Sequence, residues 1–346
     1  MLSVAFFIKD RRAHTGDSER DRRVRADAYR DSTWTASYFE EFRKCSDVSW
    51  EPYVYWRRDP FPGKFINIDS SGVRNTENFA SPSSSSPFRI LMFGGSTLWG
   101  TGARDQYTIP SLLSAELRQH GFEVEVTNYG ESGYVSTQDV ISLIIHLQRE
   151  DAPQLVIFYD GVNDTYSAYQ EQVAGLPQNE TNRVVEFNLS KPAALGRRLA
   201  MDARDSAEKL STARFLNGAL KRVGVQWQGR FASKAPQLPR RSKSSSPDEL
   251  AKDVVETYWA NVEVVTALAD HYGFQHLSYW QPTVFQKEHR TDYEEEKRRE
   301  VQAFEEHFRK TYAELSSHHL TSVPAYHFQD LSHLFSSINE PLYVDW

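Results

Sequence analysis

Short apolar runs alternate with amphipathic segments from Phe88 to the end of the chain. The runs with strand character occupy residues 89–93, 124–128, 154–160, 274–282 and 323–331. The intervening segments repeat apolar residues at helical spacing and span residues 108–117, 137–150, 249–273 and 293–315. This alternation of strand and helix predicts a parallel β-sheet with helices on both of its faces.

Each predicted helix carries a signal for its start, its inward face or its end. The first has Thr108 as its expected N-cap and Pro110 in its first turn, and its inward face is formed by Ile109, Leu112, Leu113 and Leu117. The second is expected to be capped by Thr137 and to bury Val140, Ile141, Ile144 and Leu147. The third is expected to end near Gly273. The fourth is predicted as one long helix with a core-facing stripe of Val301, Phe304, Phe308, Tyr312 and Leu315.

The chain before Phe88 has a different composition. Residues 9–45 are charged and compatible with helix, and Trp34, Tyr38 and Phe42 share a face that can dock on a core. Residues 50–69 are rich in aromatic residues and proline, which favours an extended layer packed on that core. We therefore predict an N-terminal extension over residues 1–87, ending in a serine-rich linker, followed by a domain over residues 88–346. A mobile insertion is predicted in that domain at about residues 170–248, on its proline, serine and basic content.

Composition narrows the class of protein. The formal charge of -7 argues against a nucleic-acid partner, because such proteins are usually basic. The single cysteine, Cys45, cannot form an internal disulfide. No apolar run is long enough to span a bilayer, so the chain as given is expected to be soluble. The opening "MLSVAFFI" is compatible with a shortened signal or anchor and with a docked N-terminus, so localisation and oligomeric state stay open.

The stretch "FGGSTLWGTG" places Gly94, Gly95 and Ser96 directly after the first predicted strand. A phosphate-binding P-loop requires a lysine where Thr101 stands, and a dinucleotide fingerprint requires glycine in place of Ser96. Leu98 breaks the G-x-S-x-G elbow of α/β-hydrolases. What remains is a serine at the carboxyl end of a parallel strand, the edge at which open α/β sheets bind ligands.

Two further motifs fall on the same predicted edge. "NYGESG" follows the second strand and contains Gly133, and "GVND" follows the third and contains Asn163. Acyl transfer needs a nucleophile together with N–H donors aimed at the developing oxyanion. The N–H groups of Ser96 and Gly133 and the side-chain amide of Asn163 are the candidate donors. Asp160 and Asp164 flank the third motif without the spacing of a metal site, and Asp164 is expected to hold its loop through backbone N–H groups.

In this order, "GGST", "NYGESG" and "GVND" resemble the sequence blocks of the SGNH hydrolases, the superfamily of GDSL-type lipases and acylhydrolases. The resemblance covers about residues 88–164 and the end of the chain. It implies a three-layer α/β/α sandwich with a parallel, flavodoxin-like sheet of five strands. It also implies a serine esterase or lipase without a cofactor or metal, acting on a small-molecule or glycan ester. An O-acyltransferase acting on a glycan and a binding module without catalysis are the alternatives.

The last block of that family is D-x-x-H. "DLSH" fits it literally with Asp330 and His333, but no glycine follows as is usual in the family. "PLYVDW" offers Asp345, and the histidine would then fall three positions later, beyond Trp346. We expect Asp345 to be the orienting aspartate of a chain truncated before its histidine, and we keep Asp330 and His333 as the alternative dyad. Without its base, such a chain would lose most of its rate, a factor on the order of 10⁴.

Overall fold

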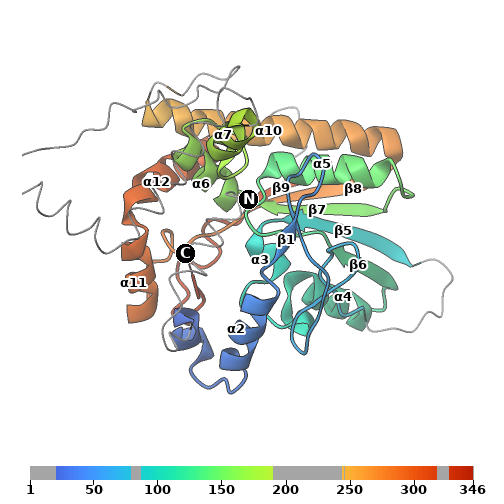
Figure 1. The fold of residues 1–346 in the computed structure, drawn as a ribbon, viewed down its shortest axis with the longest axis horizontal. Helices are drawn as coiled ribbons and strands as arrows, with labels where there is room; N and C mark the ends of the chain where they lie inside the picture. Colours follow the sequence, from blue (N-terminus) through green and yellow to red (C-terminus); the bar gives the residue numbers. More distant parts are fainter. Residues whose placement is uncertain (1–20, 79–86, 190–243, 245, 318–326, 346) are drawn as a thin grey trace, which may run out of the picture. The chain divides into compact units, whose positions relative to one another are not determined.

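The computed structural model describes residues 21–78, 87–189, 244, 246–317 and 327–345 (Figure 1). The chain divides into two compact units, one of Gly16–Gln178 with Lys243–Trp346 and the other of Met1–Thr15 with Asn179–Ser242. The described part of the latter is helix α7 (Glu180–Leu189). The sheet and all the motifs above belong to the former unit.

The centre of this unit is a sheet of five parallel strands. Along the chain these are β5 (Phe88–Gly94), β6 (Val124–Asn128), β7 (Leu155–Asp160), β8 (Gln275–Trp280) and β9 (Phe328–Asp330). Their order in space is β6-β5-β7-β8-β9, which is the flavodoxin-like 2-1-3-4-5 order. The predicted fold is thus confirmed. Residues 323–326 of the fifth predicted strand lie outside the described residues.

Helices cover both faces of the sheet and make it the middle of three layers (Figure 1). Alternate residues of β5 point to opposite faces, as the pleat requires. Leu91 and Phe93 pack under α5 (Ser136–Leu147) and α10 (Pro247–Tyr272). Ile90 and Met92 pack on the other face with partly buried leucines of α4 (Ile109–Gln119). A third cluster joins α10 to α6 (Val162–Glu171) and α12 (Gln302–Ser317).

Helix α4 begins as predicted but buries a different face in its first turns. The Thr108 hydroxyl accepts a hydrogen bond from the N–H of Ser111, so the N-cap is confirmed. Leu113 and Leu117 face the core, whereas Ile109 and Leu112 are exposed, against prediction. The reason is that the side of α4 carrying Ser111 and Ser114 is covered by residues 77–78, which hydrogen-bond to both serines.

Helix α5 starts one residue before the predicted cap. Its N-cap is Val135, and Gln138 accepts a hydrogen bond from the Val135 N–H, so the prediction of Thr137 as cap is wrong. Val140 and Leu147 are buried as predicted, but Leu143 is fully buried while Ile141 is half-buried. Val140, Leu143 and Leu147 lie at spacing i, i+3 and i+7, so they share the helix face that is buried.

The predicted long C-terminal helix is two helices. Helix α11 (Asp292–Glu300) ends at Val301, whose φ of -113° and ψ of 14° are not helical, and α12 follows at once. The apolar stripe is nevertheless in the core: Val301, Phe308, Tyr312 and Leu315 are buried and Phe304 packs against them. Gly273 ends α10 in the left-handed conformation, as predicted.

The segment before β5 forms a layer on the same unit. It contains the short 3-10 helices η1 (Arg22–Arg25) and η2 (Asp27–Tyr29), helix α2 (Thr35–Lys44), and strands β1 (Val48–Ser49), β2 (Arg57–Arg58), β3 (Phe61–Pro62) and β4 (Asn67–Ile68). Tyr38 is fully buried, with Trp34 and Phe42 packed around it, which confirms the predicted docking face. The serine-rich stretch at 79–86 and the core of the predicted insertion, 190–243, lie outside the described residues.

Candidate active site

The first loop of the candidate site is the turn from β5 into α3 (Ser96–Trp99). Gly94 requires glycine, because a Cβ there would lie 2.4 Å from the carbonyl oxygen of Tyr159 on the neighbouring strand. Ser96 is the first residue of α3 and is half-buried, while Leu98 and Trp99 behind it are fully buried. Its N–H belongs to the first helical turn, where N–H groups have no carbonyl partner within the helix.

The second loop follows β6 and is tied to the first. The N–H of Glu131 donates to the Gly94 carbonyl oxygen at 2.9 Å. Gly133 has a φ of +82°, a left-handed conformation that side chains other than glycine rarely adopt. A Cβ at Gly133 would lie 3.4 Å from Oε1 of Gln178 and 3.5 Å from the Trp56 ring. The loop thus turns with its backbone, rather than a side chain, facing these groups.

Asn163 joins the three loops. It lies near the start of α6, and its side-chain Nδ2 donates to the carbonyl oxygen of Tyr134 at 2.7 Å. The same nitrogen lies 2.2 Å from the point at which Gly95 would carry a Cβ. Gln178 Nε2 donates to Asn163 Oδ1 at 3.5 Å. The amide of Asn163 is therefore packed against the turn that carries Ser96 and bonded to the residue after Gly133.

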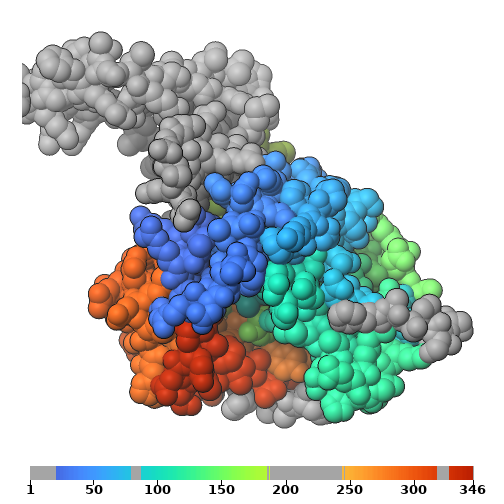
Figure 2. All heavy atoms as spheres, turned by 90° about the horizontal axis from the view of Figure 1, so that it is seen from below, coloured from blue at the N-terminus to red at the C-terminus, as the bar shows by residue number. Residues whose placement is uncertain are grey.

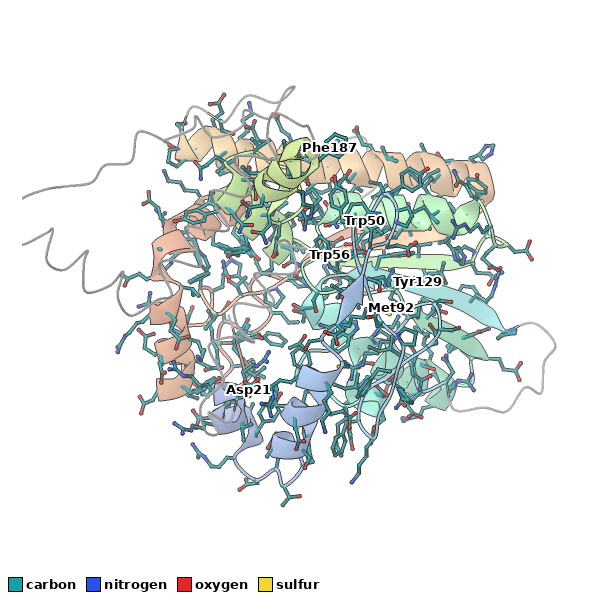
Figure 3. All side chains as sticks on the ribbon, in the orientation of Figure 1. Asp21, Trp50, Trp56, Met92, Tyr129 and Phe187 are labelled. Carbon is teal, nitrogen blue, oxygen red and sulfur yellow. The ribbon has the colours of Figure 1, made fainter. Side chains whose placement is uncertain are left out.

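The N-terminal segment holds the second loop in place, which the sequence patterns did not predict. Trp56, labelled in Figure 3, donates from its indole nitrogen to the Ser132 carbonyl oxygen at 3.0 Å. The buried Arg58 donates from Nη2 to the Ser132 hydroxyl at 2.8 Å, and its backbone N–H donates to the Glu131 carboxylate at 3.0 Å. Nε of Arg58 lies 3.4 Å from the other oxygen of Glu131, and both side chains are almost fully buried.

Two guanidinium groups also lie over the ring of Trp99, the residue that ends α3. Those of Arg58 and Arg74 are 4.1 Å and 4.2 Å from the ring centroid, within the range of cation–π interaction. Arg74 further donates to the carbonyl oxygens of Trp99 and Gly100, at the C-terminal end of α3. The aromatic residues next to Arg57 and Arg58 in the sequence are the signal that could have pointed to the contact of Arg58. Such a run is equally typical of ordinary packing.

Three carboxyl groups lie buried behind the loops: Asp139 on α5, Asp160 at the end of β7 and Asp164 on α6. Asp164 accepts from the N–H and hydroxyl of Ser136 and from the N–H of Gly161, so its predicted role in holding the loop is confirmed. Burial raises the pKa of Asp164, and these hydrogen bonds oppose that rise. Burial raises the pKa values of Asp139 and Asp160 much further, and the charge of Asp139 adds to the rise at Asp160.

The candidates for the orienting aspartate lie in two places. Half of the Asp345 side chain is exposed, and its carboxylate lies 3.6 Å from a guanidinium nitrogen of Arg23. The preceding Val344 accepts a hydrogen bond from the Tyr293 hydroxyl at 2.8 Å. It also lies 3.2 Å from the Cβ position of Gly102, in the loop after α3. The end of the chain therefore runs beside the loop that follows Ser96.

Asp330 ends β9 and is exposed, and one of its oxygens accepts from the N–H of Ser332 at 2.8 Å. His333 is exposed, and its Nδ1 lies 3.2 Å from the Ser336 hydroxyl. The structure therefore does not join Asp330 to His333 by a hydrogen bond. Among the described residues, none is hydrogen-bonded to the hydroxyl of Ser96 either. The three loops thus lie together, while the side chains of Asp330 and His333 have separate partners.

The space-filling view shows a recess on the surface of this unit (Figure 2). It is bordered by the N-terminal segment in blue, the β5–α4 region in blue-green and the C-terminal segment in red (Figure 2). Over the described part of the chain, no group of histidine, cysteine and acidic residues has the arrangement of a metal site. Over the same part, the longer helices all lack the apolar length needed to cross a membrane.

No protein-family model matches the chain, and no curated protein matches it either. Solved structures similar to it include AlinE4, described as an SGNH-hydrolase family esterase, at 30% identity over 24% of this chain, with a TM-score of 0.23. This match covers 45% of AlinE4, so the chain spans less than half the length of that relative.

Longer but weaker matches are to two acetyl xylan esterases. AlAXEase is 12% identical over 72% of this chain and 81% of its own, with a TM-score of 0.32. Axe2 from Geobacillus stearothermophilus is 11% identical over 75% of this chain and 83% of its own, with a TM-score of 0.30. These neighbours are all esterases, but the TM-scores are low, and the architecture rests on the strand order given above.

Proposed function

We propose that this chain is a serine ester hydrolase in which Ser96 is the nucleophile. The backbone N–H groups of Ser96 and Gly133 and the side-chain amide of Asn163 are the proposed oxyanion donors. One observation carries the proposal: the Asn163 amide is packed against Gly95 while it bonds the residue that follows Gly133. This contact supports the proposal because it sets the Asn163 amide against the turn that carries Ser96 and next to the loop that carries Gly133.

The proposed reaction proceeds through an acyl-enzyme. Ser96 Oγ attacks the ester carbonyl carbon, and the π electron pair moves onto the carbonyl oxygen, where the donors stabilise it. When the tetrahedral intermediate collapses, the C–O bond to the alcohol breaks and the alcohol leaves with the proton that Ser96 gave up. Water then attacks the acyl-enzyme in the same way, and the acid leaves as Ser96 regains its proton. Each preorganised donor typically contributes a factor on the order of 10²–10³ in rate.

In the first scheme a histidine oriented by Asp345 takes the proton from Ser96 and returns it to the leaving alcohol, and the position of the C-terminal segment supports this choice of carboxylate. Val344 packs beside Gly102, six residues after Ser96, which supports Asp345 as the orienting carboxylate. Asp330 and His333 are the second scheme, in which both side chains must leave their present partners, Ser332 and Ser336. The two schemes differ in one variant, because His333→Ala stops hydrolysis only in the second.

The proposal is tested with a chromogenic short-chain ester and with a fluorophosphonate that labels activated serines. Both are applied to the 346-residue chain and to a chain carrying whatever codons follow Trp346 in its reading frame. Ser96→Ala is expected to lower the rate at least about 10³-fold and to abolish labelling. Thr97→Ala is the matched control, since it removes an exposed hydroxyl from the same turn. Equal rates in the two variants, or no hydrolysis and no labelling in either chain, would refute the assignment.

A further inference from the structure

The buried acidic groups behind the three loops are not equivalent. Asp164 has three hydrogen-bond donors and is therefore satisfied as a carboxylate. Asp139 and Asp160 are 0% and 3% exposed, and within the described part of the chain no hydrogen bond of normal geometry reaches any of their four side-chain oxygens. A carboxylate buried without donors is among the most costly groups that a protein interior can contain.

These two carboxyl groups interact with each other. Each acts on the other as a side-chain hydrogen-bonding partner, and the backbone of Gly94 acts on Asp139. A hydrogen bond between two carboxyl groups needs one proton, since two carboxylates have only acceptors. Burial and the nearby charge of Asp164 raise the pKa of both, and the charge of Arg57 opposes this rise at Asp139. Tyr258 on α10 is a titratable neighbour of Asp160 and Tyr134 one of Asp139, and burial raises the pKa of both tyrosines.

The positions of the pair relate it to the candidate site. Asp160 directly precedes Gly161, the turn that leads to Asn163. Asp139 acts on the backbone of Gly94, which directly precedes the turn that carries Ser96. The pair therefore links the end of β7 to the end of β5. It lies next to the turn that carries Ser96 and the turn that carries Asn163, which contact each other at the candidate site.

We propose that Asp139 and Asp160 share one proton, and that this O–H···O hydrogen bond positions the Ser96 turn against Asn163. They are positioning residues, because they lie behind the loops and act through Gly94 and Gly161. The catalytic part of this inference rests on the proposed function, whereas the shared proton does not. Loss of the proton at alkaline pH leaves two carboxylates in contact, and their repulsion separates the two turns.

Infrared spectroscopy tests the proton without any assay of activity. The unmodified protein at neutral pH is expected to show the carbonyl band of a buried carboxylic acid. The band is expected to be lost in Asp160→Asn and in Asp139→Asn, and kept in Asp151→Asn, which alters an exposed aspartate. Absence of the band from the unmodified protein at neutral pH overturns the proposal.

Variants at Asp160 test the positioning. Asp160→Asn supplies an amide donor that does not titrate, so kcat is retained and its alkaline limb moves to higher pH with KM unchanged. Asp160→Leu supplies no donor, and a loss of about 10²-fold in kcat is expected, the effect of displacing a catalytic group by about 1 Å. Hydrogen exchange of residues 94–99 is expected to be faster in Asp160→Leu than in Asp160→Asn. Equal exchange and equal rates in the two variants overturn the positioning role.

These measurements separate the two proposals. If the unmodified chain hydrolyses no ester but shows the band and the exchange difference, the proposed function fails and the shared proton stands. If the unmodified chain hydrolyses esters but shows no band, the proposed function stands and the shared proton fails. If Asp160→Leu does not fold, the infrared band and the pH profile of Asp160→Asn decide the question.

Discussion

Replacing Arg58 with methionine should destabilise the protein far more than the same change at its neighbour Arg57. Both arginines lie on β2 and differ by one position, so they point to opposite sides of the strand. Arg58 is 2% exposed and bonds the Cys45 carbonyl oxygen and the Ser132 hydroxyl, each at 2.8 Å. Arg57 is half-buried and has one such bond, to the Tyr129 carbonyl oxygen at 3.2 Å.

The magnitude follows from what the change leaves behind. Methionine fills most of the volume over Trp99, so the main effect is that the carboxylate of Glu131, 0% exposed, loses its cation. Removing one partner of a buried ion pair costs about 3–5 kcal/mol. The loss of a single hydrogen bond at Arg57 costs about 1 kcal/mol. We therefore expect Arg58→Met to lower the free energy of unfolding by about 2–4 kcal/mol more than Arg57→Met.

Urea unfolding followed by circular dichroism measures this difference, and a double variant tests its cause. Glu131→Gln removes the charge that Arg58→Met leaves unpaired, while the amide oxygen still accepts from the Ser132 N–H. The double variant should therefore be more stable than the sum of the two single changes requires, by at least about 1 kcal/mol. Strict additivity, or an Arg58→Met variant as stable as Arg57→Met, would contradict the reasoning.

Three further predictions use other parts of the structure. Gly95→Ala places a methyl group where Nδ2 of Asn163 lies and should lower esterase kcat about 10²-fold with the protein still folded; an unchanged kcat would count against the site. Burial lowers the pKa values of His276 and His307 to about 4, so the unfolded chain binds protons that the folded chain does not. Stability should thus be lost as the pH falls from 6.5 towards 4, by up to about 3 kcal/mol for each histidine, and a urea midpoint that is constant over this range would refute it. Thr108→Ala removes the N-cap of α4 and should cost about 1 kcal/mol in urea unfolding, whereas no change would mean that the cap is dispensable.

The sheet and its order could be predicted because the information is local. Each strand is a short apolar run, each helix repeats its apolar residues at helical spacing, and right-handed crossovers leave few arrangements for such a chain. The three motif loops follow for the same reason. The carboxyl ends of parallel strands share one edge, so the residues that follow β5, β6 and β7 had to lie near one another.

The details that failed depend on neighbours distant in sequence. Ile109 and Leu112 fit a helical stripe, but residues 77–78 cover the other side of α4, and nothing within the helix encodes that contact. The break at Val301 likewise interrupts a continuous pattern. The assignments of Asp345, Asp330 and His333 stay predictions, because spacing in a motif does not fix where the side chains meet.

The sequence by itself determined the parallel sheet and the edge at which Ser96, Gly133 and Asn163 gather, because strand periodicity and glycine placement act over a few residues. Only the tertiary structure decided what holds that edge in shape. Arg58 reaches Glu131 across 73 positions of sequence. Asp139 on α5 interacts with Asp160 at the end of β7. Burial of a charged group is favourable only beside a specific partner, and folding alone brings such partners together.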